Sequence, residues 1–533
     1  MNQNTLYKNA RIFCPNSLSL FDGEFKVDKK GTIISVTRYD DSKELGESSP
    51  LEGSTVYDCE RKVVTPGCLD SHAHLWKVGQ LKVGTIDLRN AKSTSEIKSL
   101  IKDYISKNPD KPWITARGFN EEKYIDKKMP TGADLDEIST SKAIFVQRTC
   151  AHIAVVNSAA LKACQIGQNP KQPDGGSIEL DAHGFPTGVL AETALGLVTK
   201  NIPTPTDEEL MKGIIEASNE FLSHGITGVC DPGLNPHLLN IYKTMDKEKK
   251  LPVRVQAMAL HFSEDGKNLN PLEDVYKTDF LRIDVAKYYA DGGLSGSTAA
   301  VNEPYPGTDN NTGILRFEKA SFHEATEIAL SKGYGVATHA IGDRAIDFVL
   351  DEYKSKRSRY KSEVMRVEHC GVPSLSNLDD ISGHSFYVTS QPIFLKELGV
   401  NFVEALGTER LSLCYPGRSY LNKKITVGFS SDAPVVKDIS AKGGILSAIS
   451  RKLGNEEVLY HEESVTAAEA LTCYTRESAK VMGLWDITGS VETGKKADFV
   501  IWENNPSSDN LEDIEKARVL ETYVNGKLAY KAK

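Results

Sequence analysis

Short runs of alternating apolar and polar residues occupy both ends of the chain. Examples are residues 32–36 near the N-terminus and 519–530 near the C-terminus, the second built around Asn525-Gly526. A period of two is typical of half-buried strands, and an Asn-Gly pair favours a tight hairpin turn. We therefore predict one discontinuous sheet domain, formed by residues 1–66 together with 485–533.

Between the two ends, strand-like apolar runs alternate with helical segments, which is the pattern of a parallel α/β fold. Strands are predicted over residues 68–74, 228–231, 253–260, 283–290, 335–339, 365–369, 387–391 and 425–432. Eight parallel strands, connected through helices, close a (β/α)8 barrel. We assign residues 67–484 to this barrel.

A long segment after the first barrel strand, residues 77–205, is left over by this count. It has strand candidates of its own at 113–116 and 144–148, and helical runs at 94–106 and 157–164. We interpret it as a large insertion. Because it follows the C-terminal end of a barrel strand, we expect it to cover the active site.

Composition narrows the class of partner. A hydrophobic content of 40% and a charged content of 26% are ordinary for a soluble globular protein. The net charge of -9 argues against general nucleic-acid binding, because recognition of a phosphate backbone needs clustered Lys and Arg. We therefore expect a small-molecule substrate and no nucleic-acid partner.

The cysteines and the N-terminus bear on location. Nine cysteines are scattered without a C-x-x-C motif, a usage that suits a reducing compartment. The opening M-N-Q-N-T-L-Y-K-N-A lacks the apolar core of a signal peptide, and no window approaches the roughly eighteen apolar residues of a membrane span. We expect a cytoplasmic protein without membrane association.

Polar residues at the ends of the predicted strands carry the candidate chemistry. The first strand ends in His72-Ala73-His74, and residues at alternate positions of a strand project to the same side. The other candidates, from the fourth, fifth, sixth and eighth strands, are Lys287, His339, His369 and Asp432. A single His or Lys at a strand end is more often structural. Together, at the catalytic end of a barrel, these six residues favour a metal site.

With these motifs, the chain resembles the metal-dependent amidohydrolase superfamily along nearly its whole length. The similarity includes P-G-C-L-D-S-H-A-H-L at 66–75 and G-S-V-E-T-G-K-K-A-D-F-V-I at 489–501. The insertion, A-D-G-G-L-S-G-S-T-A at 290–299 and T-H-A-I-G-D-R-A-I-D at 338–347 resemble the amidohydrolase family 3 branch that contains N-substituted formamide deformylases. The resemblance implies a distorted (β/α)8 TIM barrel with a small β-sandwich formed by both chain ends.

The resemblance also implies ligand roles. It assigns His72 and His74 to a more buried ion, His339 and His369 to a more exposed one, carboxylated Lys287 to a bridge, and Asp432 to the buried ion. An unmodified ammonium has no lone pair, so Lys287 is a ligand only after carboxylation. One or two zinc ions suit such N and O ligands, with iron, manganese or nickel as alternatives. Glu192 is an alternative carboxylate ligand, or an ordinary glutamate on a helix face.

Five further residues are candidate substrate contacts: Trp76, Arg117, His152, Asp291 and Arg418. His152 opens H-I-A-V-V-N-S, and Asp291 follows the lysine strand. Arg418 could hold an anionic group, although a surface arginine is the plainer interpretation.

The leading functional hypothesis is metal-dependent hydrolysis of a non-peptide C–N bond, in an N-acyl or N-formyl amide. Metal-activated hydroxide would attack, with Asp432 as general base and then general acid. The alternatives are a mononuclear deaminase-type amidohydrolase and a non-catalytic regulatory relative, which would be expected to lack ligands. A homodimer is expected because dimers are the commonest soluble assembly.

Overall fold

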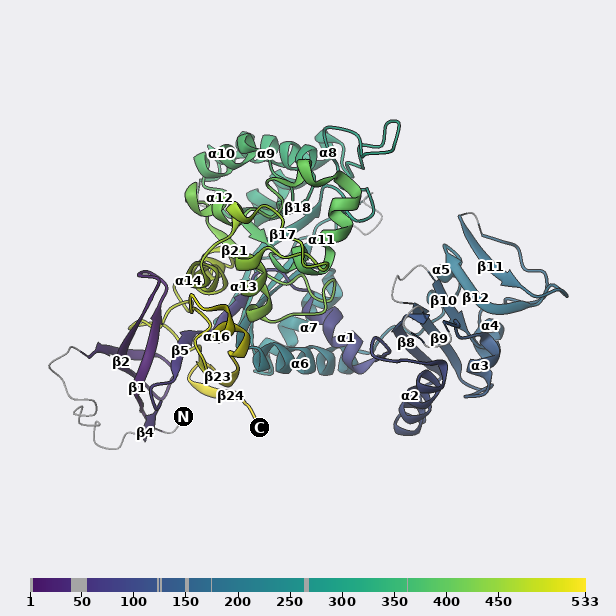
Figure 1. The fold of residues 1–533 in the computed structure, drawn as a ribbon, viewed down its shortest axis with the longest axis horizontal. Helices are drawn as coiled ribbons and strands as arrows, with labels where there is room; N and C mark the ends of the chain where they lie inside the picture. The colour runs from purple at the N-terminus through teal and green to yellow at the C-terminus, as the bar shows by residue number, and fades with distance from the viewer. Residues whose placement is uncertain are drawn as a thin grey trace. The chain divides into compact units, whose positions relative to one another are not determined.

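The computed structural model describes residues 3–39, 55–121, 124, 127–148, 153–173, 175–262, 268–361 and 363–533 (Figure 1). The described residues divide into two compact units. The first contains Met1–Leu75 and Ser218–Lys533, and the second contains Trp76–Ala217. Each unit has a hydrophobic core of its own.

Parallel strands of the first unit form a nearly closed barrel. Within the described residues they pair in the order β6 (Cys68–Asp70), β13 (Ile226–Leu234), β14 (Arg254–Leu260), β17 (Val285–Tyr289), β18 (Gly335–Ala340), β19 (Met365–His369), β20 (Tyr387–Ser390) and β21 (Val427–Phe429). The hydroxyl of Ser71 donates to the Phe429 carbonyl at 3.1 Å, which links the first strand to the last. The predicted barrel is confirmed.

The first unit also contains helices. They are α7 (Pro236–Lys247), α8 (Lys319–Ser331), α9 (Asp343–Arg357), α10 (Leu375–Gly383), α11 (Ile393–Leu406), α12 (Gly417–Asn422), α13 (Ala441–Ser450), α14 (Ala467–Thr472), α15 (Ser478–Val481) and α16 (Leu511–Lys516). Local sequence sets where several begin. Asn235 caps α7 by accepting from the Leu238 amide at 2.9 Å, and Pro236 follows at the first helical position. Short β15 (Tyr276–Lys277) and β16 (Leu281–Ile283) lie between β14 and β17 in the chain.

Both chain ends build one sheet, as predicted. Its strands are β1 (Thr5–Cys14), β2 (Ser19–Val27), β3 (Ile33–Arg38), β4 (Thr55–Asp58), β5 (Val63–Pro66), β22 (Phe499–Trp502), β23 (Val519–Val524) and β24 (Lys527–Lys531). Antiparallel pairing of β22 with β5 joins the two ends, and purple and yellow strands lie together in Figure 1. Tyr523 stacks on Phe499 at 4.4 Å between ring centroids, inside the core of this sheet.

The second unit contains the predicted insertion. Its sheet has the order β11 (Gly176–Leu180), β12 (Pro186–Glu192), β10 (Ile153–Val156), β9 (Ala143–Arg148), β8 (Trp113–Phe119) and β7 (Thr85–Asp87). The helices of this segment are α1 (Leu75–Val83), α2 (Thr94–Lys107), α3 (Gly132–Asp136), α4 (Ser158–Ala163), α5 (Leu195–Thr199) and α6 (Asp207–Ser223). That the insertion covers the strand ends of the barrel stays a prediction.

Two further observations concern the whole described chain. None of its helices is both long and apolar enough to cross a membrane. The cysteines it includes are free thiols, most of them buried.

Candidate metal centre

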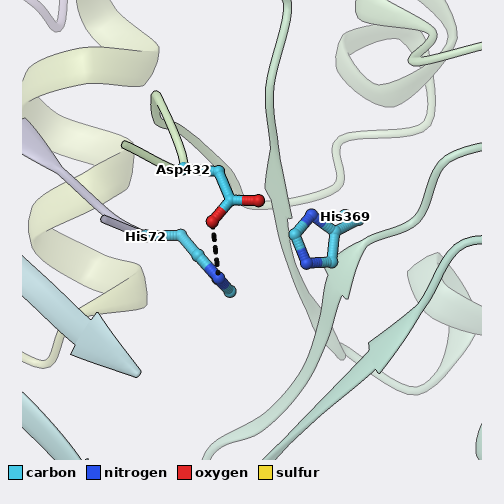
Figure 2. Close-up of side chains that lie close together, drawn as sticks. All are labelled: His72, His369 and Asp432. Carbon is cyan, nitrogen blue, oxygen red and sulfur yellow. Dashed lines mark ion pairs between the residues drawn. The ribbon is translucent and has the colours of Figure 1, made fainter. Parts of the chain in front are cut away.

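Three predicted ligands from different strand ends come together in the barrel. His72 follows β6, His369 ends β19 and Asp432 follows β21. A potential ligand atom from each lies within 4.8 Å of the others, and all three residues are buried. Figure 2 shows the Asp432 carboxylate beside the His72 ring, with the His369 ring close by. These side chains therefore form a compact N and O donor set.

The two histidines of the His-Ala-His motif meet at Asp432. Its Oδ1 atom lies 3.5 Å from His72 Nε2 and 3.4 Å from His74 Nε2. The strand was expected to continue through His74, but it ends at Asp70. The Asp70 carboxylate ends it by accepting from the backbone amides of His72 at 3.1 Å and Ser431 at 3.1 Å. The two imidazoles reach the same carboxylate despite this turn.

The remaining predicted histidine lies next to this set. The His339 and His369 rings are 4.4 Å apart between centroids, and the His369 and His72 rings are 4.7 Å apart. His339 Nε2 is 3.1 Å from the Gly292 carbonyl, whereas His369 Nδ1 is 2.9 Å from Gln391 Oε1. His72 Nδ1 contacts the Glu368 carboxylate. These contacts leave Nδ1 of His339 and Nε2 of His369 and His72 as the nitrogens available to an ion.

Burial sets the protonation of the site. It lowers the pKa of His72 and of His369 well below the usual histidine value, and neighbouring Lys287 or His339 lowers it further. Burial opposes ionisation of Asp432, but the contacts with His74 and His72 outweigh it and hold the Asp432 pKa below its ordinary value. Neutral imidazoles beside an ionised carboxylate are the forms that bind a divalent cation.

Lys287 is a buried polar residue of the site whose amine has no hydrogen-bond partner among the described residues. It is 0% exposed. The amine lies 4.9 Å from the ring centroid of Tyr289, and burial lowers its pKa to about 8. An unpaired ammonium buried in this way is unfavourable by several kcal/mol, roughly. Carboxylation would replace the ammonium with a carbamate anion, whose oxygens can bind a cation, and the residues present therefore fit the expected metal group.

Some residues of the site were missed from the sequence. Glu368 and Gln391 contact His72 and His369, and Asp70 ties β6 to the segment around Ser431. A signal was available for Glu368, because Arg366 and Glu368 place two charges in an otherwise apolar strand, Met365–His369. No comparable signal marked Gln391.

The candidate substrate contacts are dispersed. Asp291 is buried beside the metal centre, where it accepts from the Gly342 amide at 2.9 Å and lies 3.3 Å from His339 Nε2. Arg418 forms a two-pronged ion pair with Glu469 at 2.9 and 2.7 Å. Trp76 and Arg117 belong to the second unit, and His152 lies outside the described residues. All five assignments stay predictions.

Glu192, the alternative ligand, is not on a helix. It is the exposed last residue of β12, in the second unit. Val189 and Leu190 favour the extended conformation, and β12 pairs on both sides, with β10 and β11. Its role as an alternative ligand stays a prediction.

The fold and the site together define a class. A parallel barrel that gathers histidines and an aspartate at the C-terminal ends of its strands is the arrangement of a metal-dependent barrel hydrolase. Residues 55–530 match the model of the amidohydrolase family, and the chain belongs to that family.

Two curated relatives are similar in sequence to most of the chain. The putative amidohydrolase YtcJ of Bacillus subtilis is 28% identical over 480 residues, 88% of this chain and 89% of its own length. The N-substituted formamide deformylase of Arthrobacter pascens is 26% identical over 550 residues, 99% of this chain and 97% of its own.

A solved structure has a similar fold. An uncharacterized metal-dependent hydrolase from Pyrococcus horikoshii superposes with a TM-score of 0.76 at 25% identity, covering 95% of this chain and 98% of its own. The chain is therefore similar, through both units, to amidohydrolase-family hydrolases that depend on a metal.

Proposed function

We propose that this protein hydrolyses a non-peptide C–N bond of a small molecule, with an N-acyl or N-formyl amide as the first choice. One observation carries the proposal: Asp432 Oδ1 faces both histidines of the His-Ala-His motif, within reach of His369. A carboxylate held in this way has access both to an ion and to the water that the ion activates. The residues that would hold metal are His72, His74, Lys287 in its carboxylated form, His339, His369 and Asp432.

A divalent ion bound there supplies hydroxide at neutral pH, because it lowers the pKa of water from about 15.7 to roughly 7. The protein residues then handle protons and position. Asp432, whose pKa is held low, is ionised before the reaction and accepts the proton of the attacking water. Oxygen forms a bond to the acyl carbon, and the C–N bond breaks. Asp432 returns the proton to the departing nitrogen, which leaves as a neutral amine.

The substrate class rests on chemistry and on similarity. A general base that becomes a general acid suits an amide, whose nitrogen leaves only when it is protonated. The relative from Arthrobacter pascens is named for the removal of formyl groups from N-substituted formamides, and the alignment with it spans 99% of this chain. N-substituted formamides are therefore the first compounds to assay.

The direct test compares Asp432→Asn with the unaltered protein on a panel of N-substituted formamides and larger N-acyl amines. We expect kcat to fall by about 100- to 10,000-fold, the usual contribution of a positioned acid-base group. Asp438→Asn is the matched control, because Asp438 lies six positions away and accepts from Ser440 at the start of α13. Retention of most activity by Asp432→Asn would overturn the role of Asp432. Hydrolysis of no amide by the unaltered, metal-loaded protein would overturn the proposed function.

A further inference from the structure

A buried ion pair lies directly beneath the candidate metal centre. Arg366 and Glu368 occupy alternate positions of β19, so they project to the same side of the strand. Both are 0% exposed, and Arg366 Nε donates to Glu368 Oε1 at 2.8 Å. The neighbouring core is apolar, with Leu69, Met258 and Val285 among its members. Charges in such surroundings are unfavourable unless they are paired and fully hydrogen bonded.

The second oxygen of Glu368 contacts His72. Its Oε2 atom is the partner of His72 Nδ1. An ionised carboxylate only accepts hydrogen bonds, so the Nδ1 atom must carry the proton. The lone pair of the neutral ring is then on Nε2, the atom that faces Asp432. The contact therefore selects the tautomer and the ring orientation that an ion requires.

Arg366 fixes the position of Glu368 from several directions. Its NH2 group donates to the Ser71 carbonyl at 3.0 Å and to Thr389 Oγ1 at 3.1 Å, and NH1 donates to Gln256 Oε1 at 2.8 Å. Ser71 immediately precedes His72. The guanidinium thus holds both the carboxylate that contacts the ring and the backbone from which the ring extends.

We propose that Arg366 and Glu368 are positioning residues for the metal centre, which hold His72 with Nδ1 protonated and Nε2 directed at the ion. The inference rests on the proposed metal-dependent function. Stability alone is a weak reason for this pair, since buried ion pairs are often replaced by apolar residues without loss of stability. Partners of this kind tune metal affinity, and their removal typically weakens it by about 10- to 100-fold.

Glu368→Gln tests the inference with little change of shape. A glutamine amide has one accepting and one donating end, so either orientation sets an N–H group against Arg366 or against His72 Nδ1. We expect the zinc dissociation constant, measured by competition with a chromogenic chelator, to rise about 10- to 100-fold.

Asp498→Asn is the matched control for the loss of a buried pair. Asp498 and Arg254 are also 0% exposed and form a two-pronged pair at 2.6 and 2.9 Å, but Asp498 contacts no predicted ligand among the described residues. Asp498→Asn should lower the melting temperature and leave zinc affinity unchanged. Glu368→Asp, which keeps the charge on a shorter side chain, should lose less affinity than Glu368→Gln.

Each outcome has a distinct meaning. Zinc affinity unchanged in a folded Glu368→Gln protein overturns the inference, as does an equal loss of affinity in Asp498→Asn. If Glu368→Gln does not fold, zinc binding by Glu368→Asp decides. A folded Glu368→Asp protein that binds zinc more weakly supports the inference, and an unchanged zinc dissociation constant overturns it. If the unaltered protein binds no zinc, manganese, iron or nickel, the proposed function fails instead.

Discussion

At the scale of single residues, burial decides which side chains carry charge. The pKa of His72 and of His369 is lowered mainly because the rings are buried, and the same cause lowers the Lys287 pKa to about 8. The effect extends beyond the metal centre. His261, which follows β14, contacts the Tyr288 hydroxyl at 2.8 Å through Nδ1, and burial lowers its pKa to about 4.

His261 provides a test of this effect in the stability of the protein. Below pH 6.5 the unfolded chain binds a proton at this histidine, whereas the native protein does not until about pH 4. The free energy of unfolding should therefore decrease as the pH falls from 6.5 to 4, by about 1.4 kcal/mol per unit from this group. His261→Asn should lack this contribution. The difference in free energy of unfolding between the unaltered protein and the variant should therefore shrink or reverse as the pH falls. Urea unfolding of both proteins between pH 4 and 7 measures this difference. If the free energy of unfolding has the same pH dependence in both proteins, the lowered pKa of His261 is refuted.

The residue scale also shows how much of the site the sequence revealed. His72, His369 and Asp432 were predictable because barrel strands end at one face, and the structure brings them together. Glu368 was not selected, because its partner His72 lies 296 residues away in the chain. The contact between the side chains of Glu368 and His72 depends on the curvature of the barrel, and the local sequence pattern does not encode that curvature.

At the scale of elements, periodicity located the strands better than their ends. β6 ends at Asp70, because the Asp70 side chain accepts from the backbone amide of His72. The sequence pattern of apolar residues does not reveal this turn. The alternative interpretation of Glu192 as a residue on a helix face is wrong, because Glu192 ends β12, a strand that pairs with β10 and β11.

Packing between α1 and α6 yields a test at this scale. A Cβ atom added at Gly79 would lie 2.3 Å from the Gly213 carbonyl carbon, so the two helix backbones are in close contact. We expect Gly79→Ala to lower the free energy of unfolding by about 1–3 kcal/mol, the usual result of overpacking. Gly196→Ala in α5 is the control, because a Cβ atom there meets nothing within 4 Å. Equal stability of the two variants in urea would contradict the close contact.

Capping provides a second test on an element. The Asn235 side chain accepts from the Leu238 amide at the start of α7, beside barrel strand β14. Asn235→Ala should lower the free energy of unfolding by about 1 kcal/mol. Asn235→Asp should keep most of the stabilisation that the cap provides, because an aspartate side chain can also accept from the Leu238 amide. Thermal or urea unfolding of the two variants measures the difference. An alanine variant as stable as the aspartate variant would show that the cap contributes nothing.

At the scale of the whole molecule, the chain combines a sheet from both ends, a barrel and an inserted unit. The first two were predictable, because alternation at the ends and strand-helix repeats between them are strong periodic signals. The sequence also marked the insertion by what the barrel count left over. That the insertion covers the strand ends stays a prediction, because no local sequence pattern specifies long-range contacts.

We propose that a divalent metal centre, in which carboxylated Lys287 would bridge two ions, supports amide hydrolysis. Elemental analysis of protein purified without chelators, with Lys287→Ala measured alongside, tests it most directly. We predict about two ions per chain in the unaltered protein, decreasing in the variant, since paired ions share a bridging ligand in such sites. One ion in both proteins would contradict the bridge and favour a mononuclear, deaminase-type site. No ion in either protein would contradict the metal centre itself.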